Sequence, residues 1–469
     1  MKKRGFFAVL LTLLLLSNMA TYFYTRFLFY SPAAGVTGLE QTNGVRFLGE
    51  VHSILDRGYY QVLDEERLFH GAVKGMLSSL GDPYTAYLPP ELLEDMLAET
   101  TGLFSGIGVE IAEDEGEILI LRVLDSTPAY FAGLLQGDRI LEVEGVSMAD
   151  VPLEGAARML RGPEGTTVSI TLRRPGEDEL FSVALMREQI ERDTVFSKRV
   201  GENFAYVEIT SFDRDTGTDF RNTVTSLERE GLEGLIVDLR NNPGGLLDEA
   251  IEVGRFIVPR GEITRVVDRD GNVLDRYYSE AKPLDYPLVV LVNEYTASAA
   301  EIIGGALQDS KRALLVGKPT FGKASVQSLQ NLSDGGALRY TIARYLTPAG
   351  RDLHKEGLKP DYEVGLPDEY YLKNQPVPRD LEPGDMGEKV MLLQGMLQCL
   401  GYQIKLTGVF DEPLLGALKD FQDKNNLPIG VLDDLTRETI RHCLREKADM
   451  LDEQLCFALD LLKEQAGLV

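Results

Sequence analysis

Hydrophobic residues recur every three or four positions in the N-terminal part of the chain, and this spacing is typical of helices with one apolar face. The first run of such positions consists of Val45, Leu48, Val51, Ile54 and Leu55. A second run begins at Leu68. Gly81-Asp82-Pro83 interrupts the pattern, because glycine and proline disfavour a continued helix. We therefore predict helices from Val45 to about Leu97, with a break at residues 81–83.

Between Thr101 and about Ala184 the pattern changes to short apolar runs separated by glycine-rich turns. Runs such as Ile118–Val123 and Thr167–Leu172 are typical of strands, and one segment, Leu153–Leu160, has helical spacing. This part of the chain is predicted to be a small β-rich module.

From Phe204 to about Leu366 strand-like and helix-like segments alternate. The strand-like segments are almost wholly apolar, as in Gly234–Leu239 and Pro287–Val292. Such runs predict strands that are buried on both faces of a largely parallel sheet, and hence an α/β core. Active sites in such cores lie at the carboxyl ends of the strands.

Two further helical segments follow a proline-bearing linker at Pro376–Pro383. Residues 384–441 carry leucines, an alanine and a phenylalanine at helical spacing, which predicts a small helical module. A helical tail is expected from Ala448 to Leu462. This tail and the helices near Val45 are amphipathic, so both are expected to pack against partners.

The start of the chain has the pattern of a membrane anchor. Lys2, Lys3 and Arg4 precede an uncharged stretch from Gly5 to Thr25. As a helix this stretch spans roughly 30 Å, the thickness of a bilayer core, and the basic flank places the body outside the cytoplasm. A cleaved signal peptide is the alternative, but the stretch is long for one.

Composition excludes several functions. With 469 residues we expect about two to four domains, and the net charge of -26 excludes a nucleic-acid partner, because phosphates require clustered Lys and Arg. No His-Glu-x-x-His or paired Cys-x-x-Cys occurs, so neither a metal nor another cofactor is implied. Cys399, Cys443 and Cys456 are consistent either with one disulfide or with three buried thiols.

Two segments that follow predicted buried strands carry candidate chemistry. In the first, an Asn-Pro-Gly-Gly turn at 242–245 leaves backbone N–H groups of Gly244 or Gly245 free to hold an oxyanion. In the second, Ser298 begins a helix and lies between two small alanines. Ser298 taken alone is better explained as a helix N-cap than as a nucleophile, with Glu301 completing a capping box.

A lysine in Gly322-Lys-Ala-Ser-Val-Gln327 is the candidate base for this serine. A lysine titrates near 10.4, so Lys323 can act as a base only if it is buried. Phe321, Ala324 and Val326 are its expected apolar neighbours, and no carboxylate occurs between Asp309 and Asp334 to keep it charged. Gln327 reaches the lysine only through a helical turn, which we predict for the active state. The alternative is an exposed loop lysine.

Other catalytic groups are less consistent with the sequence. Of the four histidines only His354 lies near the core, where we expect a surface residue, so a histidine triad is not predicted. Ser279-Glu-Ala-Lys282 fits the Ser-x-x-Lys of penicillin-binding enzymes, but Pro283 disfavours a helix there and no Lys-Thr-Gly occurs.

Two of the modules resemble known domains. Ser105-Gly-Ile-Gly-Val109, Ala132-Gly-Leu134 and Gly137-Asp-Arg-Ile140 resemble the PDZ domain in their order and spacing. A glycine turn before a strand can hold a terminal carboxylate, and the resemblance assigns that role to Ser105, Gly106, Ile107 and Gly108. Gly384-Asp-x-Gly387 and Gly408-x-Phe-Asp411 are similar to a peptidoglycan-binding domain, which serves either as a glycan binder or as a spacer.

Together, Asn-x-x-x-Ala-Ser-Ala-Ala-Glu, the Asn-Pro-Gly-Gly turn and Gly-Lys-Ala-Ser-Val-Gln resemble the carboxy-terminal processing, or tail-specific, protease family over residues 45–469. The resemblance implies Ser298 as nucleophile, Lys323 as general base and Gln327 as the residue that positions the lysine. Oxyanion donors are then Ala299 with Gly244 or Gly245. Arg161 matches a segment that the family carries on the PDZ side facing the protease, so it is a candidate regulatory contact.

The implied fold is multidomain α/β: a ClpP/crotonase-like α/β peptidase core with an inserted β-rich PDZ domain, N-terminal helices and a C-terminal helical peptidoglycan-binding-like module. The expected divisions are an anchor at 1–30, a helical dimerisation region at 31–97, PDZ at 98–184, the Ser-Lys peptidase core at 185–372, a linker at 373–383, the peptidoglycan-binding-like module at 384–445 and a terminal helix at 446–469.

The expected function is that of a serine endopeptidase that recognises C-terminal tails through its PDZ domain and cleaves extracytoplasmic proteins. Expected partners are proteins or peptides with accessible C-termini, peptidoglycan, and a second copy in a homodimer. The expected location is the cell membrane, with a single span. The alternative is a catalytically silent PDZ and wall-binding scaffold at the cell envelope.

Overall fold

The computed structural model describes residues 43–90, 92–93, 96, 103–114, 116–149, 151–177, 179–191, 193–201 and 203–467. The chain divides into two compact units, Met1–Gly81 and Asp82–Val469. Within these described ranges, no helix is both long enough and apolar enough to span a bilayer. The expected anchor at 1–30 lies outside the described residues.

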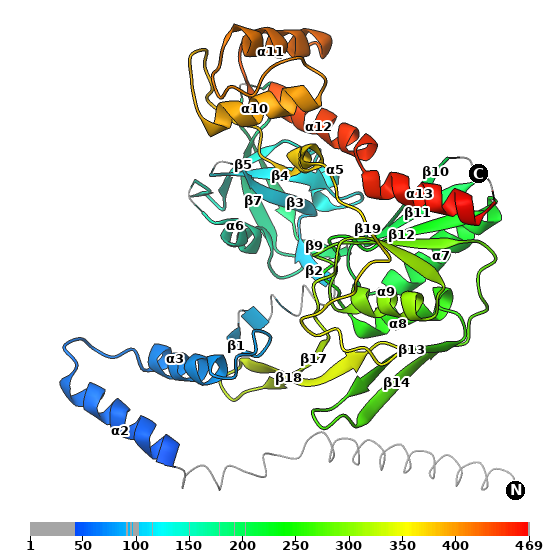
Figure 1. Ribbon diagram of the computed structural model, residues 1–469. Helices are drawn as coiled ribbons and strands as arrows, with labels where there is room; N and C mark the ends of the chain where they lie inside the picture. The colour runs from blue at the N-terminus through cyan, green and yellow to red at the C-terminus, as the bar shows by residue number, and fades with distance from the viewer. Residues whose placement is uncertain are drawn as a thin grey trace, which may run out of the picture. The chain divides into compact units, whose positions relative to one another are not determined.

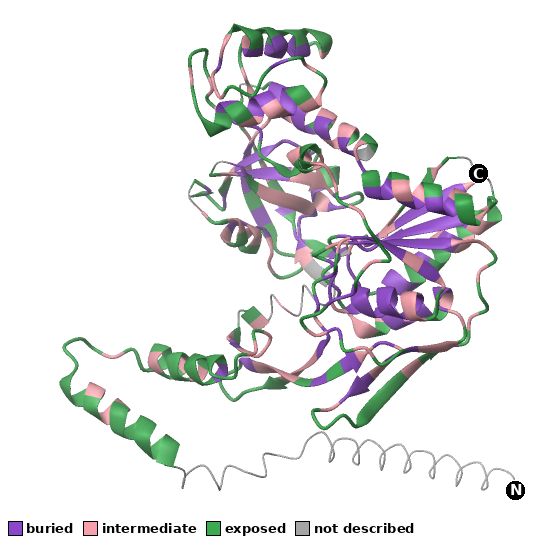
Figure 2. Ribbon diagram, viewed as in Figure 1, coloured by how far each residue is buried: buried purple, intermediate pink, exposed green. Residues whose placement is uncertain are grey.

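In its described part, residues 43–81, the first unit forms helices α2 (Asn43–Gly58) and α3 (Glu65–Ser78), in agreement with the helical spacing of its apolar residues. Asp64 caps α3 by accepting a hydrogen bond from the Arg67 N–H at 3.0 Å. None of the residues of α2 is buried, so its apolar face is open to solvent (Figure 2).

The β-rich module is an antiparallel sheet in the order β3-β4-β5-β7-β8, with β6 (Val146–Ser147) paired to β5. Its strands are β3 (Val109–Asp114), β4 (Glu117–Val123), β5 (Arg139–Val143), β7 (Thr167–Arg173) and β8 (Phe181–Met186). Helices α5 (Pro128–Phe131) and α6 (Leu153–Leu160) complete it. The chain enters the module through β2 (Leu103–Gly106) and leaves it through β9 (Glu188–Glu191). These two strands pair antiparallel with each other.

The α/β core is built on a six-stranded sheet in the order β10-β11-β12-β15-β16-β19 (Figure 1). Its strands are β10 (Val195–Val200), β11 (Phe204–Ile209), β12 (Gly234–Asp238), β15 (Leu288–Val292), β16 (Ala313–Gly317) and β19 (Tyr362–Glu363). All neighbours from β11 to β19 are parallel, and every residue of β12 and β15 is buried. The buried parallel sheet predicted from the apolar runs is confirmed.

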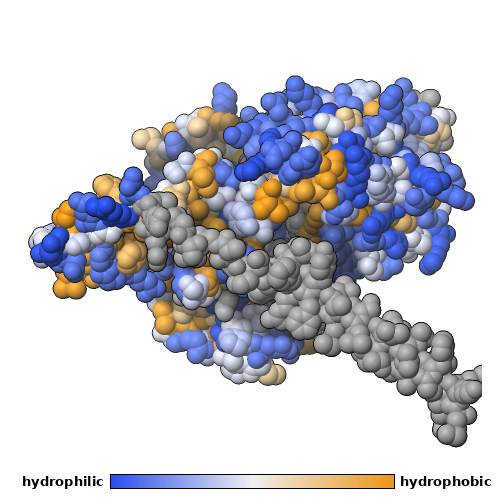
Figure 3. Space-filling view, turned by 90° about the horizontal axis from the view of Figure 1, so that it is seen from below, coloured by the Kyte–Doolittle hydropathy of each residue, from blue (hydrophilic) through white to orange (hydrophobic). Residues whose placement is uncertain are grey.

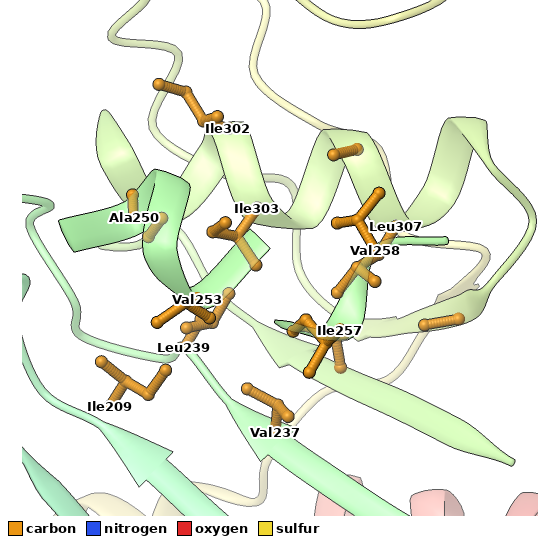
Figure 4. Packing of buried hydrophobic residues seen from close by; sticks show 14 of the residues in the cluster. Ile209, Val237, Leu239, Ala250, Val253, Ile257, Val258, Ile302, Ile303 and Leu307 are labelled. Atoms are coloured by element: carbon orange, nitrogen blue, oxygen red, sulfur yellow. The ribbon is translucent and has the colours of Figure 1, made fainter. Parts of the chain in front are cut away.

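Helices cover both faces of this sheet. One face packs against α7 (Thr216–Arg229), α8 (Leu247–Ile257) and α9 (Ala299–Asp309). Figure 4 shows Ile303 of α9 and Val253 of α8 directed toward Val237 of β12. The other face packs against the terminal helix α13 (Glu453–Gln465). The predicted C-terminal helix therefore covers the core.

A second sheet, with the order β1-β18-β13-β14 and with β17 paired to β18, lies beside the core. Its strands are β1 (Ala86–Leu88), β13 (Gly261–Val267), β14 (Val273–Ser279), β17 (Ser325–Asn331) and β18 (Ala337–Leu346). The helical interpretation of the sequence up to Leu97 is wrong at Ala86–Leu88, because these residues pair with Ala337–Arg339 of β18. Since β1 precedes the β-rich module and β18 follows it, that module is an insertion between parts of one sheet.

The C-terminal module consists of η2 (Asp368–Asn374), α10 (Glu388–Cys399), α11 (Glu412–Lys424) and α12 (Asp434–Met450). Of the apolar residues whose spacing predicted this module, five are buried together and two are half-buried against them. The buried residues are Leu393, Leu397, Ala417, Leu418 and Phe421, and the half-buried ones are Leu392 and Leu400. All three cysteines are free thiols: Cys399 and Cys443 are half-buried and Cys456 is exposed.

A buried ion cluster joins this module to the inserted β-rich module. Asp114 at the end of β3 accepts hydrogen bonds from Arg139 of β5 at 2.9 Å and from Arg437 of α12 at 3.0 Å. Asp114 is 2% exposed, and the two arginines are at most 1% exposed. Arg379 and Arg441 lie 3.5 and 3.6 Å from the same carboxylate oxygen.

Candidate active site

Ser298 lies between the carboxyl end of β15 and the first turn of α9. Its backbone has φ 58° and ψ −118°, a conformation that costs free energy in any residue with a Cβ atom. The loop before it is fixed because Thr296 Oγ1 donates to the Leu239 carbonyl at 2.7 Å and accepts from the Asn293 N–H at 3.0 Å. An ordinary N-cap residue does not require this strained backbone, because N-caps adopt the β region.

The glycine turn passes directly beside the serine. A Cβ atom on Gly244 would lie 2.7 Å from the Ser298 Cβ and 3.0 Å from the Ala299 nitrogen, and Gly244 has φ +100°. A Cβ atom on Gly245 would lie 2.3 Å from the Phe212 carbonyl oxygen. Both positions therefore require glycine, and the turn passes directly against the Ser298 side chain.

The N–H groups of this turn differ in their availability. The Gly244 N–H donates to the Asn242 side chain at 2.8 Å. Within the described part of the chain, no acceptor is found for the N–H groups of Gly245 and Ala299. Of the three expected oxyanion donors, Gly245 and Ala299 are thus unengaged and Gly244 is engaged.

Lys323 is half-buried just before β17. Burial lowers the pKa of its amine, repulsion from the Arg339 guanidinium lowers it further, and the Glu301 carboxylate opposes both effects. The amine lies 5.1 Å from the centre of the Tyr84 ring. Its expected neighbour Ala324 is buried, but Phe321 is 55% exposed and faces solvent instead.

Glu301 is the buried acid of the site, with no exposed surface. One of its carboxylate oxygens accepts from Thr320 Oγ1 at 2.5 Å and from the Gly322 N–H at 2.8 Å. The other accepts from the Ser298 N–H at 2.9 Å and from the Lys323 N–H at 2.8 Å. The sequence showed no acid near the lysine, but the fold brings one from α9, where it ties the backbones of Ser298 and Lys323 together.

Tyr345 of β18 lies between the two candidate catalytic residues. Its hydroxyl donates to the Lys323 carbonyl oxygen and is also hydrogen-bonded to the Ser298 side chain. Burial raises the pKa of Tyr345 well above its usual value, and the Glu301 carboxylate raises it further. The phenol is therefore neutral. Among the described residues, no hydrogen bond joins the Ser298 hydroxyl to the Lys323 amine.

Gln327 differs from the sequence prediction in its local structure. A helical turn from Lys323 to Gln327 was predicted for the active state, but here Ser325–Asn331 form strand β17, with a register shift between Val326 and Gln327. The Gln327 amide donates to Ser325 Oγ at 2.8 Å rather than contacting the lysine. The predicted turn is absent because β18 pairs with this segment.

His354 was expected on the surface, but it is half-buried. Its ring lies 6.4 Å from that of Tyr84 in an edge-on arrangement, and its Nδ1 atom is buried without a hydrogen-bond partner. In the described ranges, no group of three or more His, Cys, Asp or Glu side chains could hold a metal ion.

The inserted module carries a groove of about 330 Å³ between β3 and α6. It is lined at one end by Gly106, Ile107 and Gly108 and on its walls mostly by apolar side chains. Ser105 does not line the groove, and its hydroxyl is buried without a hydrogen-bond partner. Arg161 ends α6 and also lines the groove.

Sequence reasoning missed Arg187, which fixes this end of the groove. Its buried guanidinium donates to the carbonyl oxygens of Leu160 at 3.1 Å and Met159 at 2.9 Å. It directly follows the last residue of β8, where a single arginine gives no recognisable signal.

Comparisons with known proteins agree with this architecture. The model of peptidase family S41 matches residues 203–364, and that of the PDZ domain matches residues 105–185. Models of a peptidoglycan binding domain and of the activating protease CtpB N-terminal domain match residues 386–440 and 17–91.

Among curated proteins, carboxy-terminal processing protease CtpA of Bacillus subtilis (strain 168) is 33% identical over 98% of both chains. Carboxy-terminal processing protease CtpB of the same organism is 32% identical over 89% of this chain and 88% of its own. A solved photosystem II D1 C-terminal processing protease is 32% identical, covering 69% of this chain and 89% of its own with a TM-score of 0.43.

The fold and the matching families define a serine-type peptidase that carries a PDZ domain. The chain belongs to the carboxy-terminal processing protease family, peptidase family S41. It is therefore a protease, and the alternative of a silent scaffold is not supported.

Proposed function

We propose that Ser298 and Lys323 form the catalytic dyad of this protease. The observation that carries the proposal is Ser298 itself, a strained residue at the end of a buried parallel strand, with a glycine turn against its Cβ atom. The Lys323 amine is half-buried with a lowered pKa, which suits a base that must be neutral.

In the proposed reaction, the Lys323 amine takes the hydroxyl proton of Ser298 as Oγ bonds to the scissile carbonyl carbon. The N–H groups of Gly245 and Ala299 hold the oxyanion that forms. The ammonium then gives its proton to the leaving amine as the peptide C–N bond breaks. Attack by water on the acyl-enzyme, again with the amine as base, restores the serine.

The reaction requires the serine hydroxyl to leave Tyr345 and turn toward Lys323. Gln327 can contact the amine only after the first residues of β17 change conformation, and the register shift at this point makes such a change local. We assign Gln327 the role of holding the amine in the reactive state, and Gly244 that of allowing the turn to approach the serine.

We propose that the groove of the PDZ domain binds the C-terminal tail of a substrate protein. The backbone at residues 106–108 is suited to holding the terminal carboxylate, and the strand edge of β3 can pair with the tail. Ser105 supports the turn from outside the groove. Because Arg161 lines the groove and follows α6, we assign it the role of reporting whether the tail is bound.

We place the protein outside the cytoplasm, with the peptidoglycan binding domain in contact with the cell wall. Its membership of a wall-binding family supports this location. The uncharged stretch from Gly5 to Thr25, flanked by basic residues, supports anchoring through a single membrane span.

A homodimer is the assembly we propose. Apolar side chains on the N-terminal helices are widely exposed, among them Phe47 at 63%, Ile54 at 58% and Met76 at 65% (Figure 3). A helix with an uncovered apolar face is stabilised by a partner, and a second copy offers the same face. Sedimentation of the soluble region tests this: Ile54→Glu should convert a dimer into a monomer, and a wild-type monomer would contradict the proposal.

Hydrolysis of an unfolded protein with an apolar C-terminal tail tests the dyad. The soluble region is compared with Ser298→Ala and Lys323→Ala, with Lys318→Ala as a control because Lys318 is a half-exposed neighbour whose amine lies 3.9 Å from Glu294. Loss of cleavage in the first two variants alone supports the proposal. Equal cleavage in all four proteins would overturn it.

A further inference from the structure

The segment that precedes the PDZ domain supplies a wall of the peptidase site. Asp82 begins a tight turn in which its carboxylate accepts from the Tyr84 N–H at 2.9 Å and from Thr85 Oγ1 at 2.6 Å. Desolvation raises the pKa of this carboxyl, but these hydrogen bonds and one with Thr341 outweigh it, so the pKa lies below its usual value. Asp82 therefore stays charged and holds the turn closed.

The turn is fastened to strand β18. The Arg339 guanidinium donates to the Tyr84 carbonyl oxygen at 3.1 Å, and the Thr341 N–H donates to Thr85 Oγ1 at 3.2 Å. Strand β1 then continues the attachment by pairing with β18. These contacts fix the position from which the Tyr84 ring extends.

The Tyr84 ring faces the Lys323 amine, whose nitrogen lies 5.1 Å from the ring centre. His354 supports the ring from a third element, at 6.4 Å between ring centres. The other charged or titratable groups that act on the amine are Arg339 and Glu301.

We propose that Tyr84 is a positioning residue for the general base: its ring covers the Lys323 amine, excludes water from it and fixes its place beside Ser298. This inference rests on the proposed role of Lys323. It extends that role to a residue outside the segments recognised as catalytic in the sequence.

Two effects of the ring on the amine oppose each other, and the proposal assigns the larger effect to the removal of water. The π face of an aromatic ring attracts a cation and so favours the ammonium, whereas removal of water favours the neutral amine. Desolvation is the largest cause of the lowered pKa of Lys323. Truncation of Tyr84 should therefore raise the pKa, because water would reach the amine.

The test measures the titration of Lys323 directly, in a Ser298→Ala background that does not require catalysis. Trace labelling with an acylating reagent across a pH series, followed by mass spectrometry of the peptide that contains Lys323, gives the midpoint of amine reactivity. Lys318, which is half-exposed, serves as the reference in the same digest. The added variants are Tyr84→Ala, Tyr84→Phe and Tyr87→Phe, with Tyr84→Ser as a second truncation should the alanine variant fail to fold.

Tyr87→Phe is the matched control. Tyr87 belongs to the same attached segment, and its hydroxyl donates to Asp334 at 2.7 Å, so the variant removes one hydrogen bond and leaves the lysine untouched. We expect truncation of Tyr84 to raise the midpoint by about one pH unit, and Tyr84→Phe to restore it. With Ser298 intact, the acid limb of the kcat/KM profile should move to higher pH by the same amount. At neutral pH, kcat/KM should therefore fall about tenfold.

An unchanged midpoint after truncation, or a midpoint raised equally by Tyr87→Phe, would overturn the inference. Failure of the proposed dyad gives a separate result. In that case Lys323→Ala would keep the activity of the wild-type protein, whatever the labelling midpoints are.

Discussion

Two buried acids of this protein are stabilised in opposite ways. Glu301 in the peptidase site is fully buried, and its four hydrogen bonds come from neutral donors. Asp114, in the cluster between the PDZ domain and the C-terminal module, is 2% exposed and surrounded by arginines.

The difference in hydrogen-bond donors matches the different roles of the two carboxylates. Within the described part of the chain, no ion pair joins the Glu301 carboxylate to the Lys323 amine. A direct pair would hold the lysine protonated and unable to act as a base. Neutral donors let Glu301 fix the backbones on both sides of the site, whereas the arginines around Asp114 neutralise it and join two modules.

The largest effect should come from Glu301→Gln. A glutamine has one carbonyl oxygen, and its amide hydrogens would face the N–H groups of Ser298 and Lys323, which lose their acceptor. We expect kcat/KM on a peptide substrate to fall about a hundredfold or more while the protein remains folded. Near wild-type kcat/KM, with folding verified by circular dichroism, would show that Glu301 is a simple helix cap.

Asp114→Ala should act on stability rather than on catalysis. It removes the most buried acid that Arg139 and Arg437 share and leaves them the less buried Asp434. Removing one partner from such a buried cluster costs about 3–5 kcal/mol. Urea unfolding should show this loss in the free energy of unfolding of the joined modules. Unchanged stability would show that the cluster does not join the two modules. A fall in kcat/KM as large as that of Glu301→Gln, at a temperature where the variant is folded, would also contradict a purely structural role of Asp114.

A smaller effect is expected from Arg339→Gln, which removes the charge that repels the Lys323 ammonium. Because the pKa of Lys323 is lowered partly by this repulsion, the variant should have a higher pKa. In the proposed reaction the amine acts as a base when it is neutral, so activity rises with pH through this pKa. The acid limb of kcat/KM should therefore move to higher pH by less than about one unit. A limb that moves to lower pH would contradict this sign.

The smallest effect should come from Arg122→Ala on β4. Arg122 lies 4.0 Å from Glu110, and both side chains are more than 40% exposed. Exposed pairs contribute less than about 1 kcal/mol, so urea unfolding should barely change. A loss as large as that of Asp114→Ala would remove the distinction between buried and exposed pairs.

Features encoded by local sequence were predicted well. The apolar runs of β12 and β15 and the helical spacing in the C-terminal module define their elements without help from distant residues. The Asn-Pro-Gly-Gly turn and Ser298 were also found, because each follows a recognisable buried strand.

Features that depend on distant pairing were missed. Ala86–Leu88 was taken for helix because its partner strand β18 lies beyond the entire PDZ domain. The sequence also gave no sign that the segment from Lys323 to Gln327, for which a turn is predicted in the active state, pairs with β18 in this structure. Glu301 was read only as a capping residue, since three of its donors belong to residues 320–323. Nothing in the sequence placed Tyr84 beside Lys323.

Covalent labelling of Ser298 tests the central claim most directly. The soluble region is treated with a serine-reactive fluorophosphonate across a pH series, and the adduct is counted and located by mass spectrometry. We predict one adduct, on Ser298, that forms faster as pH rises and is lost in Lys323→Ala. Modification of a different residue, or an unchanged labelling rate in Lys323→Ala, would contradict the Ser-Lys mechanism.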